Sequence, residues 1–283
     1  MVEDDDAYQG VGWEDPKVIK WWQEGFTAGA DPEYVEQMLP LAAAHVAGAR
    51  VPAAAVLDIG CGEGQVARYV AAYLAGAAET DHAGAGAGRG TPMVVGVDPS
   101  WAQAQEVRAR GGGVAPALAV AGALPFPTES FDTVVVCLVF EHIDDAEGAL
   151  AEVARVLRPG GRFVFLLNHP LLQTPGSGWV DDPDLGGQYW RVGPYLAQDH
   201  SLEEVDDNIW LPYVHRPLST IVNTLSDNGL LISRMEEPEP PAGFLAEAEE
   251  DYPDAALIPR LMLLVADKLA PEPAAKPANK SRW

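Results

Sequence analysis

The feature that most restricts the fold of this chain is the stretch VLDIGCGEGQVAR at residues 56–68, where a short apolar run turns through three glycines into a helical stretch. Such a run is typical of a buried strand, and the residues after the glycines have helical periodicity. Glycine lets a main chain adopt left-handed conformations and lets a ligand approach it closely. The stretch therefore predicts a strand, a tight turn that contacts a ligand, and a helix.

The chain repeats this alternation, which is the pattern of a parallel sheet with crossover helices. We expect strands at residues 55–59, 93–97, 131–138, 161–167, 231–236 and 261–266. We expect helices near residues 65–75, 101–110, 145–157 and 216–228, each ended by Gly, Pro or Asn. The sequence therefore predicts an α/β, doubly wound, Rossmann-like sheet.

Several segments lie outside this alternation. Residues 1–50 and 170–215 are rich in aromatic residues, and we expect N-terminal cap helices and an inserted substrate cap. The Gly/Ala-rich residues 76–92 are typical of a flexible surface insertion, and the tail at 271–283 has a disordered composition. The Rossmann-like domain is then divided into a cofactor-binding half, residues 51–169, and a C-terminal part, residues 216–270.

The composition excludes several classes of function. The chain has 42 acidic and 18 basic residues and a formal net charge of −24, so we expect neither nucleic acid nor membrane as a partner. The start, MVEDDD, lacks the features of a secretory signal, and the two cysteines are too few for a disulfide framework. We therefore expect a cytoplasmic protein that acts on a small molecule, and the sequence leaves its assembly open, with a homodimer among the alternatives.

The spacing of the glycines restricts the classes of ligand that the turn can bind. It is G-x-G-x-G rather than the G-x-G-x-x-G that seats a dinucleotide pyrophosphate, which disfavours nicotinamide and flavin cofactors. Asp98 follows Gly60 by 38 residues, or by 22 when residues 76–91 are left out. An acid at about this distance, at the end of the second strand, usually accepts hydrogen bonds from ribose hydroxyls. The residues fit a ligand with a ribose and no phosphate.

The chain contains four motifs, VLDIGCGEG, VVGVDPS, ALPFPTESFDTVVVCLVFEHIDD and RVLRPGGRFVFLLNH, in that order. With these motifs the chain resembles, over about residues 53–168, the class I S-adenosylmethionine-dependent methyltransferases, in the small-molecule branch similar to the ubiquinone-biosynthesis enzymes. It implies S-adenosyl-L-methionine as the cofactor. It also implies cofactor contacts from Asp58, Gly60, Cys61, Gly62, Gly64 and Asp98, and we expect Pro99 to contact the cofactor as well.

The adenine end of the site departs from this resemblance. Many relatives carry Asp three or four residues before LPF, whereas this chain has Val120 and Ala121 in AVAGALPF. We expect the main chain at Ala121, Gly122 and Ala123 to recognise adenine instead. Ring packing is expected from one of three side chains: Leu124, Trp101 or Pro99.

Two histidines are candidates for the base that a hydroxyl acceptor requires. His142, in FEHIDD after the fourth strand, is the first, because its ordinary pKa of about 6.5 suits proton removal at neutral pH. A histidine that only closes over the cofactor is the alternative. His169, in LLNHP after the fifth strand, is the second, with an alternative role in anchoring the cap. No metal is expected, and a divalent cation near these histidines is the less favoured alternative.

Aromatic rings interleaved with acids and amides suit a polyhydroxylated acceptor, because sugar faces stack on rings while hydroxyls bond to acceptor atoms. The stretches HPLLQTPGSGW, QYWRVGPYL and HRPLS also look similar to actinobacterial glycan-modifying enzymes, which include the mannoside 1-O-methyltransferases of methylmannose polysaccharide synthesis. We therefore expect O-methylation of a glycan, with a polyketide, quinone or lipid acceptor as the alternative and a non-catalytic cofactor-binding subunit as a third. The expected acceptor contacts are Glu141, Asn168, Trp22, Trp179, Tyr189, Trp190 and Tyr195.

Overall fold

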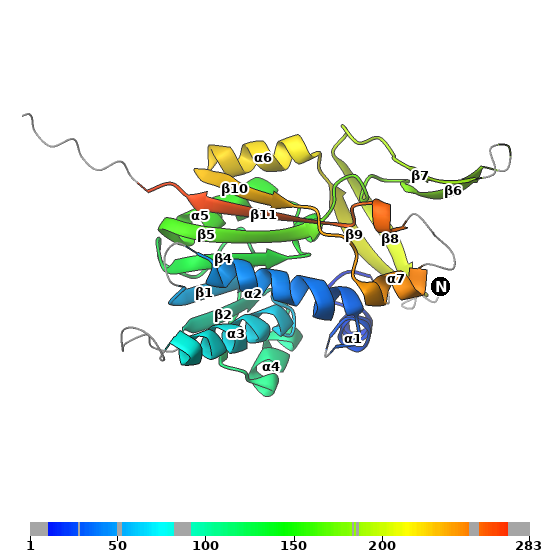
Figure 1. Cartoon of the computed structure of the whole chain (residues 1–283). Coiled ribbons are helices and arrows are strands. Elements are labelled where there is room, and N and C mark those ends of the chain that lie inside the picture. Colours follow the sequence, from blue (N-terminus) through cyan, green and yellow to red (C-terminus); the bar gives the residue numbers. More distant parts are fainter. Residues whose placement is uncertain are drawn as a thin grey trace, which may run out of the picture.

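The computed structural model describes residues 11–27, 29–49, 53–81, 92–182, 184, 187–248 and 255–270. Seven strands form one sheet in the order β10-β11-β5-β4-β1-β2-β3 (Figure 1). They are β1 (Ala55–Ile59), β2 (Met93–Asp98), β3 (Val114–Leu118), β4 (Phe131–Cys137), β5 (Leu157–Asn168), β10 (Leu230–Glu236) and β11 (Leu261–Lys268). The first five run parallel, and β11 is antiparallel to both of its neighbours.

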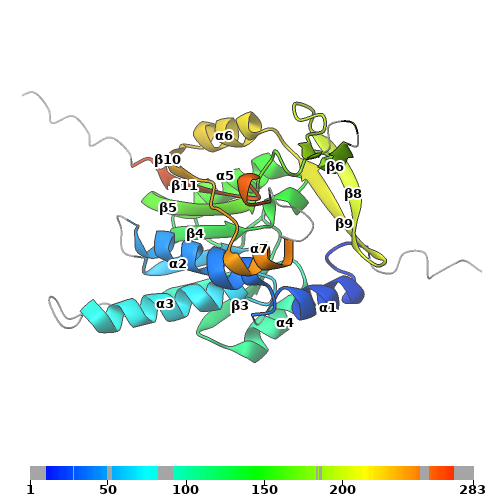
Figure 2. The same cartoon turned by 45° about the vertical axis from the view of Figure 1, so that its right-hand side comes forward.

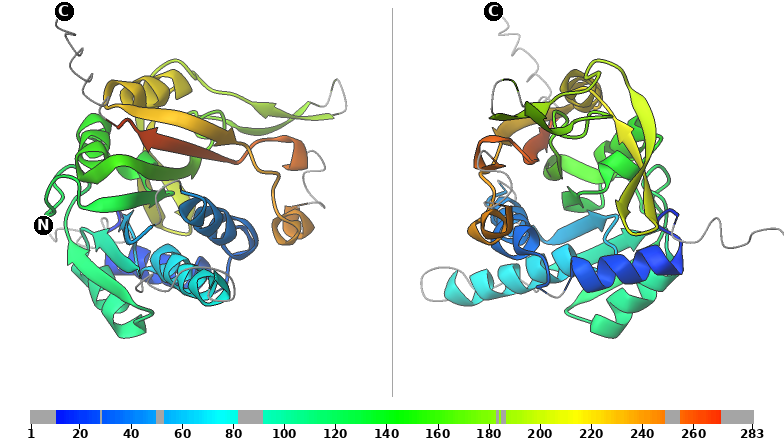
Figure 3. Two further views of the ribbon diagram at one scale, coloured as in Figure 1. Left: turned by 60° about the vertical axis from the view of Figure 1, so that its left-hand side comes forward. Right: turned by 90° about the vertical axis from the view of Figure 1, so that its right-hand side faces the viewer.

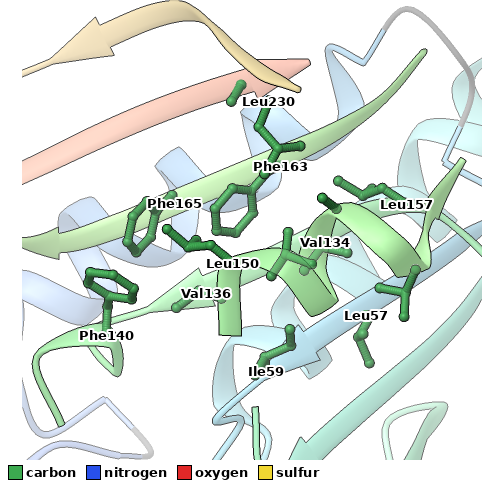
Figure 4. Close-up of a cluster of buried hydrophobic side chains, with 14 of the residues drawn as sticks. Leu57, Ile59, Val134, Val136, Phe140, Leu150, Leu157, Phe163, Phe165 and Leu230 are labelled. Atoms are coloured by element: carbon green, nitrogen blue, oxygen red, sulfur yellow. The ribbon is translucent and has the colours of Figure 1, made fainter. Parts of the chain in front are cut away.

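Helices cover both faces of the sheet, so its central strands are buried on both sides. One face packs against α2 (Leu39–Ala47), α3 (Gln65–Asp81) and α4 (Trp101–Arg110), and the other against α5 (Ala146–Val156) and α6 (Leu218–Asp227). Leu57 and Ile59 of β1 point into the second core, together with Phe163 and Phe165 of β5 (Figure 4). Six of the seven strands were predicted. β3 was not, because its five residues, VAPAL, carry a central proline.

Two predicted boundaries are wrong. Residues 1–50 are not all cap, because α2 buries Ala42, Ala43 and Val46 against the sheet with Val164 of β5. Residues 76–81 are not part of a flexible loop, because they are the last turns of α3. The rest of the predicted insertion, residues 82–91, and the predicted tail at 271–283 lie outside the described residues.

The remaining elements gather at the carboxyl end of the parallel strands. They are α1 (Pro16–Gly25), the π-helical turn η2 (Glu33–Met38), the 3-10 turns η3 (Phe140–His142) and η4 (Ala255–Leu257), the helix α7 (Ala242–Ala248), and two hairpins. The hairpins are β6 (Gly178–Asp182) with β7 (Gly187–Arg191), and β8 (Asp199–Asp206) with β9 (Ile209–His215).

Helix α1 and the β8–β9 hairpin form one cap and lie side by side (Figures 2 and 3). Val18 of α1 is fully buried against Ile209 and Leu211 of β9. The indole Nε1 of Trp21 donates to Asp206 Oδ2 at 2.8 Å. The two aromatic segments therefore meet where α1 packs on the β8–β9 hairpin. In the described part of the chain, no helix is long and apolar enough to cross a membrane.

Candidate functional site

The turn after β1 is a left-handed backbone that only glycine adopts easily. Gly60 and Gly62 have φ angles of 70° and 52°. The N–H groups of Gly60 and Cys61 both donate to the carbonyl of Val97, at 2.7 and 3.0 Å, which ties the turn to β2. A Cβ at Gly60 would lie 2.4 Å from a methyl carbon of Val139. The first glycine is therefore required by packing.

Gly62 differs from Gly60, because its Cβ position is open. The nearest atoms are Gln103 Nε2 and Trp22 Nε1, each 3.9 Å away. The N–H of Gly62 donates to Asp98 Oδ2 at 3.0 Å, while Ser100 N–H donates to Oδ1 at 2.9 Å. Each carboxylate oxygen can still accept a second hydrogen bond. Asp98 can therefore accept hydrogen bonds from a diol placed over this open backbone.

Asp58 is the second acid of the turn. Its side chain is 2% exposed, and its Oδ2 has no hydrogen-bond partner among the described residues. Burial raises the pKa of Asp58 to about 8, although a main-chain hydrogen bond from Ala67 acts in the opposite direction. A buried acid with an unpaired oxygen is costly unless a ligand satisfies it. A cationic amino group would do so, and S-adenosylmethionine carries one at its amino-acid end.

A pocket of about 500 Å³ opens above this turn, which is within the range of small-molecule sites. It lies where β1 separates β2 from β4, the switch point at which ligands bind in doubly wound sheets. No lysine or arginine is among the described residues that line it. The predicted cofactor contacts that line it are Asp58, Gly60, Cys61, Gly62, Asp98, Pro99, Ala121, Gly122 and Ala123.

His142 lines the pocket from the turn η3, directly after β4. Its Nδ1 lies 2.7 Å from the carbonyl oxygen of Pro212 in β9. A carbonyl can only accept, so Nδ1 carries the hydrogen and the lone pair of the neutral ring is on Nε2. Trp13 and Tyr213 hold the ring, with centroids 4.9 and 4.7 Å from it.

The charge state of His142 suits a base. Burial lowers its pKa, although Glu141, the Pro212 carbonyl and Glu203 act in the opposite direction. The ring is therefore neutral at pH 7, with an unprotonated Nε2. A neutral imidazole with a fixed tautomer is the form that removes a proton from a hydroxyl.

His169 lies outside the pocket lining, and its contacts do not fit a base. The N–H of Leu171 donates to Nδ1 at 3.1 Å, and Nε2 lies 2.9 Å from Glu237 Oε1. Both ring nitrogens are therefore occupied by protein, which agrees with the anchoring role. The buried pair formed by Glu141 and Asn168, whose amide donates to Glu141 Oε1, also lies behind the lining rather than in it.

The aromatic residues predicted to contact the acceptor divide into two groups. Trp22 lines the pocket. Trp179, Tyr189 and Trp190 belong to the β6–β7 hairpin, which projects away from the sheet (Figure 1). Tyr195 accepts from Leu218 N–H through its hydroxyl and from His215 through its carbonyl. The structure does not bring these four to the pocket: three lie on the projecting hairpin, and Tyr195 is bound to His215 and Leu218 instead.

Three residues expected near the cofactor also lie elsewhere. Gly64 is outside the lining, and a Cβ there would lie 3.1 Å from Val107 of α4, so this glycine serves helix packing. Trp101 is 63% exposed on α4, and Leu124 is buried in the core against α5. Of the three candidates for packing adenine, only Pro99 lines the pocket.

The sequence analysis did not single out several lining residues as site residues. Trp13 and Tyr34 belong to the N-terminal aromatic cluster, but nothing in their spacing distinguishes them from Trp21, which faces Asp206. Leu138 lines the pocket with a φ of 52°, a left-handed conformation that is rare for leucine and often marks a functional site. Sequence alone carries no signal for that strain.

The described residues contain no group of three or more His, Cys, Asp or Glu side chains placed to hold a metal ion. His142 and His169 contact different partners, Pro212 and Glu237, so they do not share a site.

Comparisons with known proteins find a family whose members match the part of the chain that forms this site. Residues 57–165 match the family model described as "Methyltransferase domain". The matched range runs from β1 through most of β5, and it includes the glycine turn, Asp98 and His142.

Similar sequences and structures extend beyond this range. An uncharacterized methyltransferase, YcgJ, of Bacillus subtilis is 34% identical over 123 residues, which are 42% of each chain. The ubiquinone/menaquinone biosynthesis C-methyltransferase UbiE of Geobacter sulfurreducens is 32% identical over 168 residues, 53% of this chain and 57% of that one. A crystal structure of an S-adenosylmethionine dependent methyltransferase from Mesorhizobium loti superimposes with a TM-score of 0.62 at 26% identity, covering 81% of this chain and 96% of that one.

The alignment with the Bacillus protein thus spans less than half of that relative's length. The chain has the Rossmann-like methyltransferase fold, which confirms the predicted fold class. The cofactor that goes with this fold and domain is S-adenosylmethionine, as predicted.

Proposed function

We propose that this chain is an S-adenosylmethionine-dependent O-methyltransferase that methylates a hydroxyl group of a small, uncharged acceptor, with His142 as the general base. The match to the methyltransferase domain and the similarity of the fold support S-adenosylmethionine as the cofactor. The observation that carries the acceptor chemistry is the hydrogen bond from His142 Nδ1 to the Pro212 carbonyl, because it leaves Nε2 as the free base.

The cofactor would be held along the glycine turn. Asp58 would take its amino group, the main chain at Gly62 would lie beneath its amino-acid end, and Asp98 would accept from its ribose hydroxyls. Bound S-adenosylmethionine supplies a methyl group activated by a sulfonium sulfur. The protein then has to align the acceptor with that methyl group and take up the hydroxyl proton on His142 Nε2.

The walls of the pocket indicate which acceptors it admits. Aromatic side chains come from Trp13, Trp22 and Tyr34, and the lining acids include Asp145. Because the described lining carries acids and no cation, a phosphorylated or carboxylated acceptor would be repelled. An uncharged acceptor with one flat apolar face suits the site.

Among uncharged acceptors we propose a carbohydrate hydroxyl. Sugar rings stack their apolar faces on tryptophan, and a sugar hydroxyl has a pKa far above 7 and therefore needs the base that the geometry provides. A phenol, quinone or other activated carbon acceptor needs less help from a base. His142 thus favours the hydroxyl over the carbon chemistry named for the Geobacter relative.

Transfer of a labelled methyl group from S-adenosylmethionine tests this proposal. The acceptor panel contains neutral oligosaccharides and methyl glycosides, their phosphorylated counterparts, simple phenols and demethylated quinones. We expect label in the neutral glycosides, recovered as a methyl ether, and none in the phosphorylated ones. Label in a quinone carbon would overturn the acceptor assignment. Cofactor binding without transfer to any member would favour a non-catalytic subunit.

A further inference from the structure

The turn that carries His142 is too short to hold its own shape. Within η3 and its flanks, His142 N–H donates to the Val139 carbonyl at 2.9 Å and Ile143 N–H to the Phe140 carbonyl at 3.2 Å. A single 3-10 turn has weak hydrogen-bond geometry and few bonds of its own. The orientation of the His142 side chain therefore depends on what surrounds the turn.

Arg216, the residue that follows β9, binds the main chain of this turn through its guanidinium group. Its Nη1 donates to the Phe140 carbonyl at 3.2 Å, and its Nη2 donates to the Asp144 carbonyl at 3.0 Å and to the Ile143 carbonyl. The guanidinium carbon also lies 5.0 Å from the centroid of the Phe140 ring. The three carbonyls belong to residues on both sides of His142.

These contacts are unusual for a buried cation. Arg216 is 4% exposed, and burial lowers its pKa. Among the described residues its hydrogen bonds go to main-chain carbonyls, while the carboxylates of Asp144 and Glu141 act on its charge without a hydrogen bond to it. Burying a charge costs free energy, and an apolar side chain of similar size would fill the space at lower cost. The fixed, planar fork of arginine is what an apolar residue or a lysine could not supply.

Strand β9 thus holds the turn twice. Near its middle, the Pro212 carbonyl accepts from the His142 side chain, and directly after its end Arg216 donates to main-chain carbonyls on both sides of His142. We infer that Arg216 is a positioning residue for methyl transfer, which fixes the orientation of His142 Nε2 through the turn η3. This inference rests on the proposed role of His142 as the base.

Loss of the hydrogen bonds from Arg216 should raise the pKa of His142. Burial of the ring keeps its pKa low, so a ring that swings toward water regains a pKa nearer its ordinary value of about 6.5. The charged groups that face it raise the pKa in the same direction: Glu141 on the turn itself and Glu203 on β8. Tyr213 contacts the ring from β9, and Asp144, beyond the turn, lies 3.5 Å from His200.

The test compares the wild type with Arg216→Lys and Arg216→Met by nitrogen NMR of the histidine rings across pH, with His142→Ala to assign the signal. We expect the wild-type ring to carry hydrogen on Nδ1, and both variants to lose this tautomer preference and to titrate at higher pH. In the methyl-transfer assay, we expect kcat to fall on the order of 10²-fold in Arg216→Met, with a smaller loss in Arg216→Lys. The affinity for S-adenosylhomocysteine should stay unchanged.

A matched control is Arg162→Met. Arg162 also caps carbonyls, of His45 and Gly48, but on β5 away from the pocket, so its loss should lower stability and leave the His142 titration unchanged. A double-mutant cycle adds a second criterion, because Arg216→Met in the His142→Ala background should cost little further activity.

Wild-type tautomer and titration in folded Arg216→Lys or Arg216→Met would overturn the inference. An additive loss in the double mutant would overturn it too. Should His142→Ala alone keep wild-type turnover, the proposed role of His142 fails, whereas the NMR result still decides whether Arg216 orients the ring.

Discussion

The main-chain N–H of Gly62 donates a 3.0 Å hydrogen bond to Oδ2 of Asp98, which joins the turn after β1 to the carboxylate at the end of β2. The two residues stand 36 positions apart in the chain, yet parallel pairing of β1 with β2 brings their strand ends together. This link makes the turn and the acid one unit, and the first predictions concern it.

Asp98→Ala should weaken binding of S-adenosylhomocysteine. The substitution removes the expected ribose acceptor and leaves the Gly62 N–H without its partner. Hydrogen bonds to a charged group contribute about 1.5–3 kcal/mol, so the Kd should rise roughly 10- to 100-fold in isothermal titration. Asp267→Ala, which breaks the ion pair with Arg162 elsewhere in the sheet, is the control and should keep wild-type affinity.

Valine at Gly62 and at Gly64 should have different effects. Gly62→Val places a side chain at the wall of the pocket, so ligand binding should be lost; its positive φ of 52° strains valine as well, but the added atoms crowd no neighbour. A side chain at Gly64, where φ is 87°, would crowd Val107, so Gly64→Val should lower the melting temperature while any folded protein still binds. Equal loss of affinity per folded molecule in both variants would contradict this division.

Asp58 should make the stability of the ligand-free protein fall as the pH rises. Its pKa of about 8 in the fold lies above that of an unfolded aspartate, so the folded state binds the proton more tightly. Its stabilising contribution is complete below about pH 4 and is lost as the pH rises through about 8. The melting temperature of Asp58→Asn, relative to wild type, should therefore increase from pH 5 to pH 8. If the melting temperatures of the two proteins changed with pH in the same way, the Asp58 carboxyl would not be protonated in the folded protein.

Trp22 should affect the acceptor and Trp179 should not. Trp22 lines the pocket and stacks on Phe26 at 4.7 Å between ring centroids, whereas Trp179 pairs with Trp190 on the projecting hairpin. Trp22→Leu should raise the KM for the acceptor by roughly 3- to 10-fold. Trp179→Leu is the matched control. A rise in KM with the control variant alone would place the acceptor against the β6–β7 hairpin instead.

The sequence could predict those features that depend on short, local sequence patterns, but not contacts between distant parts of the chain. The glycine turn, Asp98 and the strands around them have local patterns, and the structure places them as expected. The grip of Arg216 on Phe140 joins residues 76 positions apart, and the bond from His142 to Pro212 joins residues 70 positions apart. No local periodicity encodes such contacts.

The cap shows the same limit. The aromatic content of residues 170–215 predicted one inserted cap, whereas these residues form two hairpins, β6–β7 and β8–β9, of which the second meets α1. Glycines and acids in β6, β7 and β8 and the proline in β9 weaken the strand pattern of these segments. The contact of His169 with Glu237 likewise joins distant parts of the chain, and no local pattern predicts it.

The kinetics of His142→Ala test the central claim most directly, provided that turnover and cofactor affinity are measured on the same preparation. A positioned general base contributes about 10²–10⁴-fold, so kcat for hydroxyl methylation should fall by that order, while the Kd for S-adenosylhomocysteine stays within about twofold. His169→Ala, whose ring nitrogens are already occupied, should keep wild-type kcat per folded molecule. Near wild-type turnover in His142→Ala would contradict the account, because the hydroxyl proton would then leave by a route that does not use this ring.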